Sequence, residues 1–146
     1  MPSPSARQSH MKVHMGKTPG LDSNDYIDDI AFKFNILNKT ADYTILAKES
    51  GSIFTNVGIT ADIEFTLPTK ADGLIYWFYN CVDFELKVTS DVADTMAAFN
   101  DAAADSLAFT TASEHIGNGM MVFSDGTSWF SAVLIAGAAA TATVAS

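Results

Sequence analysis

The middle of the chain alternates apolar and polar residues at a spacing of two. Residues 61–67 are apolar at every odd position and polar at Asp62, Glu64 and Thr66, and Pro68 follows directly. Successive side chains of a β-strand point to opposite faces, so this segment is predicted to be a strand with one buried face. Asp62 and Glu64 are therefore expected to face away from the core.

Comparable short segments recur between turn residues along most of the chain. They are rich in β-branched and aromatic residues, and Asp125-Gly126 is a hairpin signal before Trp129, which we expect to be buried. About eight short strands at close spacing favour an all-β fold, a single β-sandwich or jelly-roll-like domain with an extended N-terminal arm. The predicted strands cover residues 43–46, 53–55, 61–67, 74–79, 84–88, 107–111, 120–123 and 129–135.

Three segments allow more than one interpretation. In residues 25–37 the alternation of Phe32, Phe34 and Ile36 favours a strand, although the segment also fits one helical face. Residues 91–105 are rich in Ala, Asp and Asn and could form a helical turn or an Ala-rich loop. Residues 136–146 are of low complexity and could be a tail or a closely packed strand. Their small side chains would permit a subunit contact.

The composition divides the chain into three parts. Residues 1–24 contain Pro, Ser, Gly, His and Lys with little aliphatic bulk, which predicts an extended arm without a core of its own. Residues 25–136 form the predicted β domain, and residues 137–146 a small-residue C-terminal segment. A solvated, flexible terminus is the simpler alternative for the arm.

Charge is distributed unevenly along the chain. Residues 25–146 carry 5 Lys and 16 Asp or Glu, a net charge of −11, whereas the arm holds Arg7, Lys12 and Lys17 against Asp22. An acidic body argues against nucleic acid as a partner, because phosphate contacts need Lys and Arg on one face. A mildly basic arm on such a body suggests that the arm docks on another molecule.

Candidate catalytic groups are few. The histidines are His10, His14 and His115, and the spacing of the first two would suit a metal only on a helix with a third ligand. Cys81 stands alone, so it has no intrachain disulfide partner. Carboxylates on predicted strands, Asp62 and Glu64 among them, leave a small glycan-active enzyme as a remote alternative. The sequence predicts a protein that is not an enzyme, with no cofactor and no metal.

The chain shows no membrane-spanning or export signal at the level of its sequence. The longest apolar stretch, residues 132–140, is half alanine and glycine and too short to span a bilayer. The N-terminus lacks the apolar segment of a secretory signal peptide. No membrane partner is therefore expected.

Four consecutive aromatic residues stand out. Tyr76, Trp77, Phe78 and Tyr79 must alternate between the two faces of a strand. One face can fill the core, and the other must be covered by a second sheet, a partner subunit or a ligand. We take these four residues as a candidate subunit interface, with a strand buried on both sides within one subunit as the alternative.

The order of these segments resembles a module of tailed-phage virion proteins. The resemblance covers residues 42–136, and its motifs are turns, a Pro-closed strand and a terminal Gly-Thr-x-Trp hairpin. The matching residues are 42–46, 50–58, 63–68, 73–78, 94–96, 112–119 and 125–129. None of these motifs is a catalytic signature.

This resemblance implies a capsid decoration (cement) protein or a head- or tail-fibre module. Such proteins are small, β-rich and usually trimeric, so it implies a homotrimer on the outer capsid surface of the virion, with the major capsid protein as partner. The arm would then hold the capsid, and its contact residues are predicted to be Arg7, Lys12, Val13 and Lys17. A receptor- or carbohydrate-binding module of a fibre or tail is the alternative.

Overall fold

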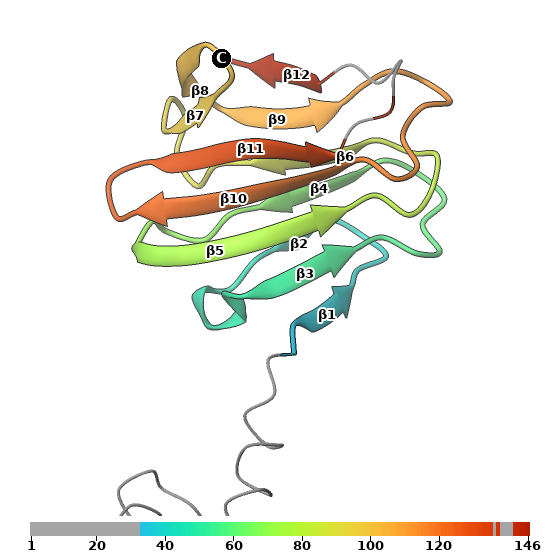
Figure 1. Cartoon of the computed structure of the whole chain (residues 1–146), viewed down its shortest axis with the longest axis horizontal. Coiled ribbons are helices and arrows are strands. Elements are labelled where there is room, and N and C mark those ends of the chain that lie inside the picture. Colours follow the sequence, from blue (N-terminus) through green and yellow to red (C-terminus); the bar gives the residue numbers. More distant parts are fainter. Residues whose placement is uncertain (1–32, 136, 138–141) are drawn as a thin grey trace, which may run out of the picture. The chain divides into compact units, whose positions relative to one another are not determined.

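The structure is a computed structural model that describes residues 33–135, 137 and 142–146. Within them, twelve β-strands and one short 3-10 turn form two mixed sheets that pack against each other around one core (Figure 1). The predicted all-β sandwich is confirmed. The arm, with Arg7, Lys12, Val13 and Lys17, lies outside the described residues, as do His10, His14 and residues 25–32.

Each sheet has a defined strand order. The seven-stranded sheet runs β1 (Asn35–Asn38), β3 (Ser52–Thr55), β5 (Asp72–Tyr79), β10 (Gly119–Asp125), β11 (Trp129–Ile135), β7 (Met96–Ala98) and β8 (Asp101–Ala104). The five-stranded sheet runs β12 (Ala142–Ala145), β9 (Ser106–Phe109), β6 (Leu86–Thr89), β4 (Ile63–Thr66) and β2 (Tyr43–Thr44). The 3-10 turn η1 (Ala47–Glu49) follows β2.

The first six strands alternate between the two sheets. β1, β3 and β5 are parallel neighbours in one sheet, and β2, β4 and β6 are parallel neighbours in the other. The chain therefore winds through three flattened coils, each giving one strand to each sheet. The second half adds antiparallel strands, with β10 beside β5, β11 beside β10 and β9 beside β6.

Aromatic rings from both sheets fill the core. Phe54 and Phe78 of the seven-stranded sheet contact Phe65 of the five-stranded sheet, with ring centroids 5.5 and 5.3 Å from it. Trp129 is fully buried, as predicted, and its Nε1 donates a hydrogen bond of 3.0 Å to Asp91 Oδ1. Rings in such pairs add to the free energy gained by burial alone, so this cluster fastens the two sheets together.

Buried asparagines join the ends of neighbouring coils. Asn56, Asn80 and Asn118 are each at most 1% exposed. Asn56 Nδ2 donates to Asn80 Oδ1 at 2.8 Å, and the backbone N–H of Asn80 donates to the carbonyl of Asn118 at 2.9 Å. Asn80 Nδ2 also donates to the carbonyl of Phe84 at 2.7 Å. Buried polar groups cost free energy unless they are paired, and these amides pair one another and the turns around them.

Residues 91–105 differ from both interpretations of the sequence. They form the hairpin of β7 and β8, in which Met96, Ala98 and Ala104 are buried, with Phe99 at the turn at φ 50°. β7 also pairs with the start of β11, Met96 opposite Trp129. Pairing with a distant strand has overridden the local preference of an alanine-rich segment.

Two other segments can be compared with the prediction. β12 pairs with β9 in antiparallel register, so part of the C-terminal segment is a packed strand, one of the two alternatives. β2 is shorter than predicted and ends at Thr44, because the chain turns into η1, where Glu49 Oε2 accepts a hydrogen bond from the N–H of Leu46.

Replacement of Asn80 by alanine should destabilise the fold. The change leaves the Asn56 amide and the Phe84 carbonyl without this partner in a buried site, and each such loss costs about 1–3 kcal/mol. We expect the free energy of unfolding of Asn80→Ala to fall by about 2–4 kcal/mol in urea titrations. The control Asn35→Ala, at the exposed start of β1, should stay within about 0.5 kcal/mol of wild type. Equal stability of the two variants would contradict a role for the asparagine network.

Alkaline pH should destabilise the fold through Tyr76. Its hydroxyl donates to the carbonyl of Leu46 at 3.2 Å. Burial, followed by the charge of Glu49, raises the pKa of Tyr76 to about 12. The folded state holds this proton more tightly than the unfolded chain, where the pKa is near 10. The stabilisation is therefore complete below pH 10 and is lost as pH rises toward 12.

The measurement is urea unfolding of wild type and Tyr76→Phe between pH 8 and pH 12. Wild type should lose about 2–3 kcal/mol more than the variant over the upper two pH units. Parallel loss in both proteins would show that Tyr76 does not control the alkaline transition.

Candidate interaction surface on the seven-stranded sheet

The outer face of the seven-stranded sheet carries an apolar row across five strands. Successive pairings place Ile36, Ile53, Trp77, Met121 and Ala132 opposite one another, from β1 through β3, β5 and β10 to β11. Alternation along each strand sends the neighbouring residues into the core. This row therefore occupies the side of the sheet that the sandwich core leaves uncovered.

A second apolar row lies beside the first. Ile75 of β5 is opposite Phe123 of β10, which is opposite Phe130 of β11, and Phe130 is opposite Ala97 of β7. The rings of Phe123 and Phe130 stack with centroids 5.2 Å apart and planes 24° from parallel. We call the two rows together the apolar face, and the stacked pair the Phe123–Phe130 ridge.

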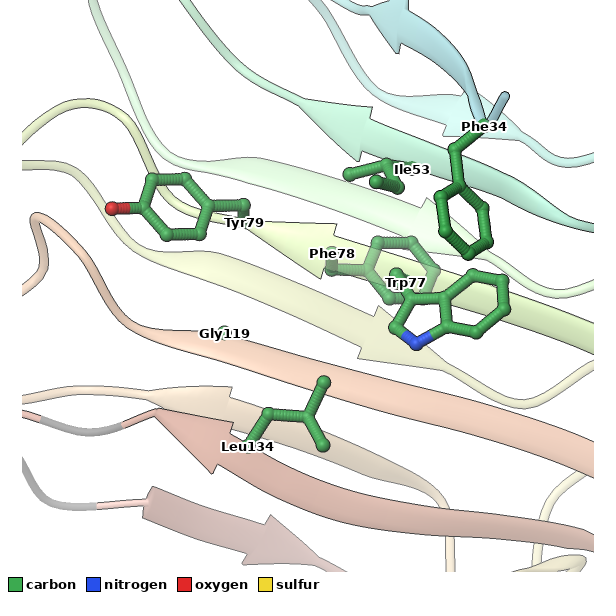
Figure 2. A pocket seen from close by; sticks show the side chains of 7 residues that line it. All are labelled: Phe34, Ile53, Trp77, Phe78, Tyr79, Gly119 and Leu134. Atoms are coloured by element: carbon green, nitrogen blue, oxygen red, sulfur yellow. The ribbon is translucent and has the colours of Figure 1, made fainter. Parts of the chain in front are cut away.

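A hollow of about 220 Å³ opens at one end of the apolar face. The ring of Phe34 packs edge-on against Trp77 at 4.9 Å and 72°. Figure 2 shows these two rings on one side of Gly119 and Leu134 on the other. The lining residues are Phe34, Ile53, Trp77, Phe78, Tyr79, Gly119 and Leu134. Gly119 lies close to β5, and a Cβ there would be 3.1 Å from the carbonyl oxygen of Phe78 and 3.7 Å from Cδ2 of Tyr79.

Exposed large hydrophobic side chains gather here. Of the ten in the described residues, five lie on the apolar face or at its hollow: Phe34, Ile36, Tyr79, Phe123 and Leu134. Ile36 is 66% exposed and Leu134 is 53% exposed. Scattered single hydrophobics are normal on protein surfaces, but a contiguous cluster marks an interaction site.

The outer face of the five-stranded sheet has the opposite character. A row of threonines, Thr44, Thr66 and Thr89, runs across β2, β4 and β6. Beside it, Lys87 Nζ lies 2.5 Å from Glu64 Oε2, and this hydrogen bond raises the pKa of Lys87. Glu64 thus faces away from the core, as predicted. The outer face of the five-stranded sheet therefore carries polar and charged side chains over β2, β4 and β6, whereas the two rows of the apolar face carry none.

The aromatic run of β5 alternates as predicted. Tyr76 and Phe78 are buried in the core, whereas Trp77 and Tyr79 lie on the outer side at the hollow. Of the four residues predicted to form a subunit interface, Trp77 and Tyr79 can therefore contact another subunit, whereas Tyr76 and Phe78 belong to the core. The sequence analysis did not assign Met121, Phe123 and Phe130 to this surface. Residues 120–123 and 129–135 are apolar at nearly every position, which is typical of strands with two apolar faces.

Of the carboxylates named as candidate catalytic groups, Asp62 accepts a structural hydrogen bond and Glu64 pairs with Lys87, and Asp42 lies beside them. Asp42 Oδ1 accepts from the N–H of Glu64, and Asp62 Oδ1 accepts from the N–H of Glu85, each at 2.8 Å. The carboxylates thus tie successive coils together at one edge of the five-stranded sheet. Together with Ile63, Glu64, Glu85 and Lys87 they line a hollow of about 280 Å³ that is separate from the apolar face.

His115 is buried in the loop before β10. Its Nδ1 lies 3.0 Å from Asp83 Oδ1, and its carbonyl accepts a 3.3 Å hydrogen bond from the N–H of Asn118. These contacts fix the loop that leads to Gly119. In the part of the chain that the structure describes, no three His, Cys, Asp or Glu residues cluster to hold a metal ion.

No family model matches the chain, and no curated protein matches it significantly. Across the described residues, no helix has the length and hydropathy that a membrane crossing requires.

Proposed function

We propose that this chain is a structural virion protein that binds the outer surface of a phage capsid and stabilises it as a decoration protein. The observation that carries the proposal is the apolar face, an uncharged surface on an otherwise acidic sandwich. The resemblance of residues 42–136 to virion modules supports the same class. The proposed partners are the major capsid protein and further copies of this chain, assembled as a homotrimer.

The physical basis is the cost of leaving the apolar face in water. Burial of apolar surface gains roughly 25 cal/mol per Å², so covering two rows of aliphatic and aromatic side chains is a strong driving force for association. Trp and Tyr are enriched among the residues that dominate binding energy at protein interfaces. Trp77 and Tyr79 have this role in the proposal, together with Phe123.

Carbohydrate binding by a fibre module is the second candidate, favoured by Trp77 and Tyr79 beside the hollow. Sugar hydroxyls need polar side chains around the aromatic platform, since small-molecule sites combine apolar walls with placed hydrogen-bonding groups. The side chains around this hollow are apolar except for the hydroxyl of Tyr79 and the indole N–H of Trp77. That lining favours a protein partner over a glycan.

The role of the arm stays a prediction. In the proposal, residues 1–24 grip the capsid, with Arg7, Lys12, Val13 and Lys17 as contacts, while the β domain supplies the assembled body. Exposed ion pairs contribute only about 0–1 kcal/mol each, so three arms on one trimer would act by avidity.

The test is co-sedimentation of the purified full chain with capsids that lack it. We expect saturable binding and a higher temperature of capsid disruption. A chain without residues 1–24 should bind at least 10-fold more weakly, because the deletion removes the proposed capsid contacts of every arm. Its melting temperature serves as the control for folding. Failure of the full chain to bind, combined with retention on a glycan array, would replace decoration by the carbohydrate-binding alternative.

A further inference from the structure

We infer that a second copy of this chain covers the apolar face, with the Phe123–Phe130 ridge of one copy seated in the hollow beside Gly119 of another. This inference rests on the self-association in the proposed function and not on the trimeric number, because a contact in which each ridge meets the other copy's hollow is two-fold and joins two copies. It specifies the partner of the apolar face and the side chains that meet there.

The ridge and the hollow are complementary features of one surface. Phe123, which is 39% exposed, stacks on Phe130, and Gly119 lines the hollow together with Trp77 and Leu134. The two features are four residues apart along β10, roughly 13 Å at the rise of a strand. A second copy brings both features at this same spacing, so each can meet its counterpart.

The distribution of charge also favours a second copy. Residues 33–146 hold 5 Lys and 13 Asp or Glu, a net charge of −8, so two copies repel each other over most orientations. The two rows of the apolar face contain only uncharged residues. Contact through this face removes apolar surface from water without bringing carboxylates together. Anionic partners such as nucleic acid or acidic lipid would gain no lysine from it.

The size of the face fits a reversible assembly. The five strands of the first row hold 4, 4, 8, 7 and 7 residues, and at about 4.8 Å between strands and about 3.3 Å per residue they span roughly 480 Å² of sheet. A standard protein interface buries about 800 Å² on each partner, so this contact alone lies toward the small end. We therefore expect association that depends on concentration in the micromolar range.

The experiment is sedimentation velocity of the full chain from 1 to 100 µM. Phe123→Asp removes the ridge and places a charge on it, whereas Leu134→Trp fills the hollow. Both should weaken association at least 10-fold. Val92→Asp and Val92→Trp are the matched controls, because Val92 is 56% exposed in the β6–β7 connection, away from the face. Both controls should assemble like wild type, and melting curves should show that all four variants fold.

Tryptophan fluorescence provides a second measurement. Trp129 is already fully buried, whereas Trp77 is partly exposed. Assembly should therefore shift the emission of wild type to shorter wavelength as concentration rises. The shift should be absent from Phe123→Asp and from Trp77→Phe.

A wild-type chain that is monomeric at 100 µM would overturn the inference, as would face variants that assemble as tightly as wild type. Capsid binding by a monomeric wild type would leave the proposed function standing and remove only the self-contact. Assembly that responds to both face variants, without capsid binding, would preserve the self-contact and remove decoration. A dimer mass would support the ridge-in-hollow contact and contradict the proposed trimer.

Discussion

Successive side chains of a strand point to opposite faces of its sheet, and the most consequential strand here is β5. Tyr76 and Phe78 enter the core, where the Phe78 ring contacts those of Phe54 and Phe65. The same backbone must then hold Trp77 and Tyr79 on the other side. A strand that is aromatic at four consecutive positions cannot satisfy all of them within one sandwich. The apolar outer face is the direct consequence of this pattern.

The sheet topology extends the apolar outer face from β5 to five neighbouring strands. Parallel coils bring β1 and β3 to one side of β5, and the hairpin of β10 and β11 occupies the other (Figure 1). The buried asparagines hold the coil ends in register, and Asn118 fixes the loop that enters β10. Core packing and backbone hydrogen bonding thus align the two apolar rows. Contacts among the side chains of the rows are not needed for this alignment.

The sequence predicted those features that depend on local pattern. The alternation in residues 61–67 and the hairpin signal at Asp125-Gly126 correspond to β4 and to the β10–β11 turn, where Gly126 has φ +86°. The parallel pairings and the Asn56–Asn80 bond could not be predicted, because each joins residues 17 or more positions apart in the sequence. The alanine-rich β7–β8 hairpin was not predicted, because β7 forms a strand by pairing with β11, which is distant in the sequence. The aromatic run of β5 predicted part of the candidate surface, but the extent of the surface depends on which strands lie beside β5.

Hydroxyl-radical footprinting of the full chain at 1 and 100 µM tests the central claim, that copies of this chain cover the apolar face. The account predicts that oxidation of Trp77 and Met121 falls at the higher concentration while that of Val92 is unchanged. Equal oxidation of Trp77 and Met121 at both concentrations, or protection of Val92 instead, would contradict it.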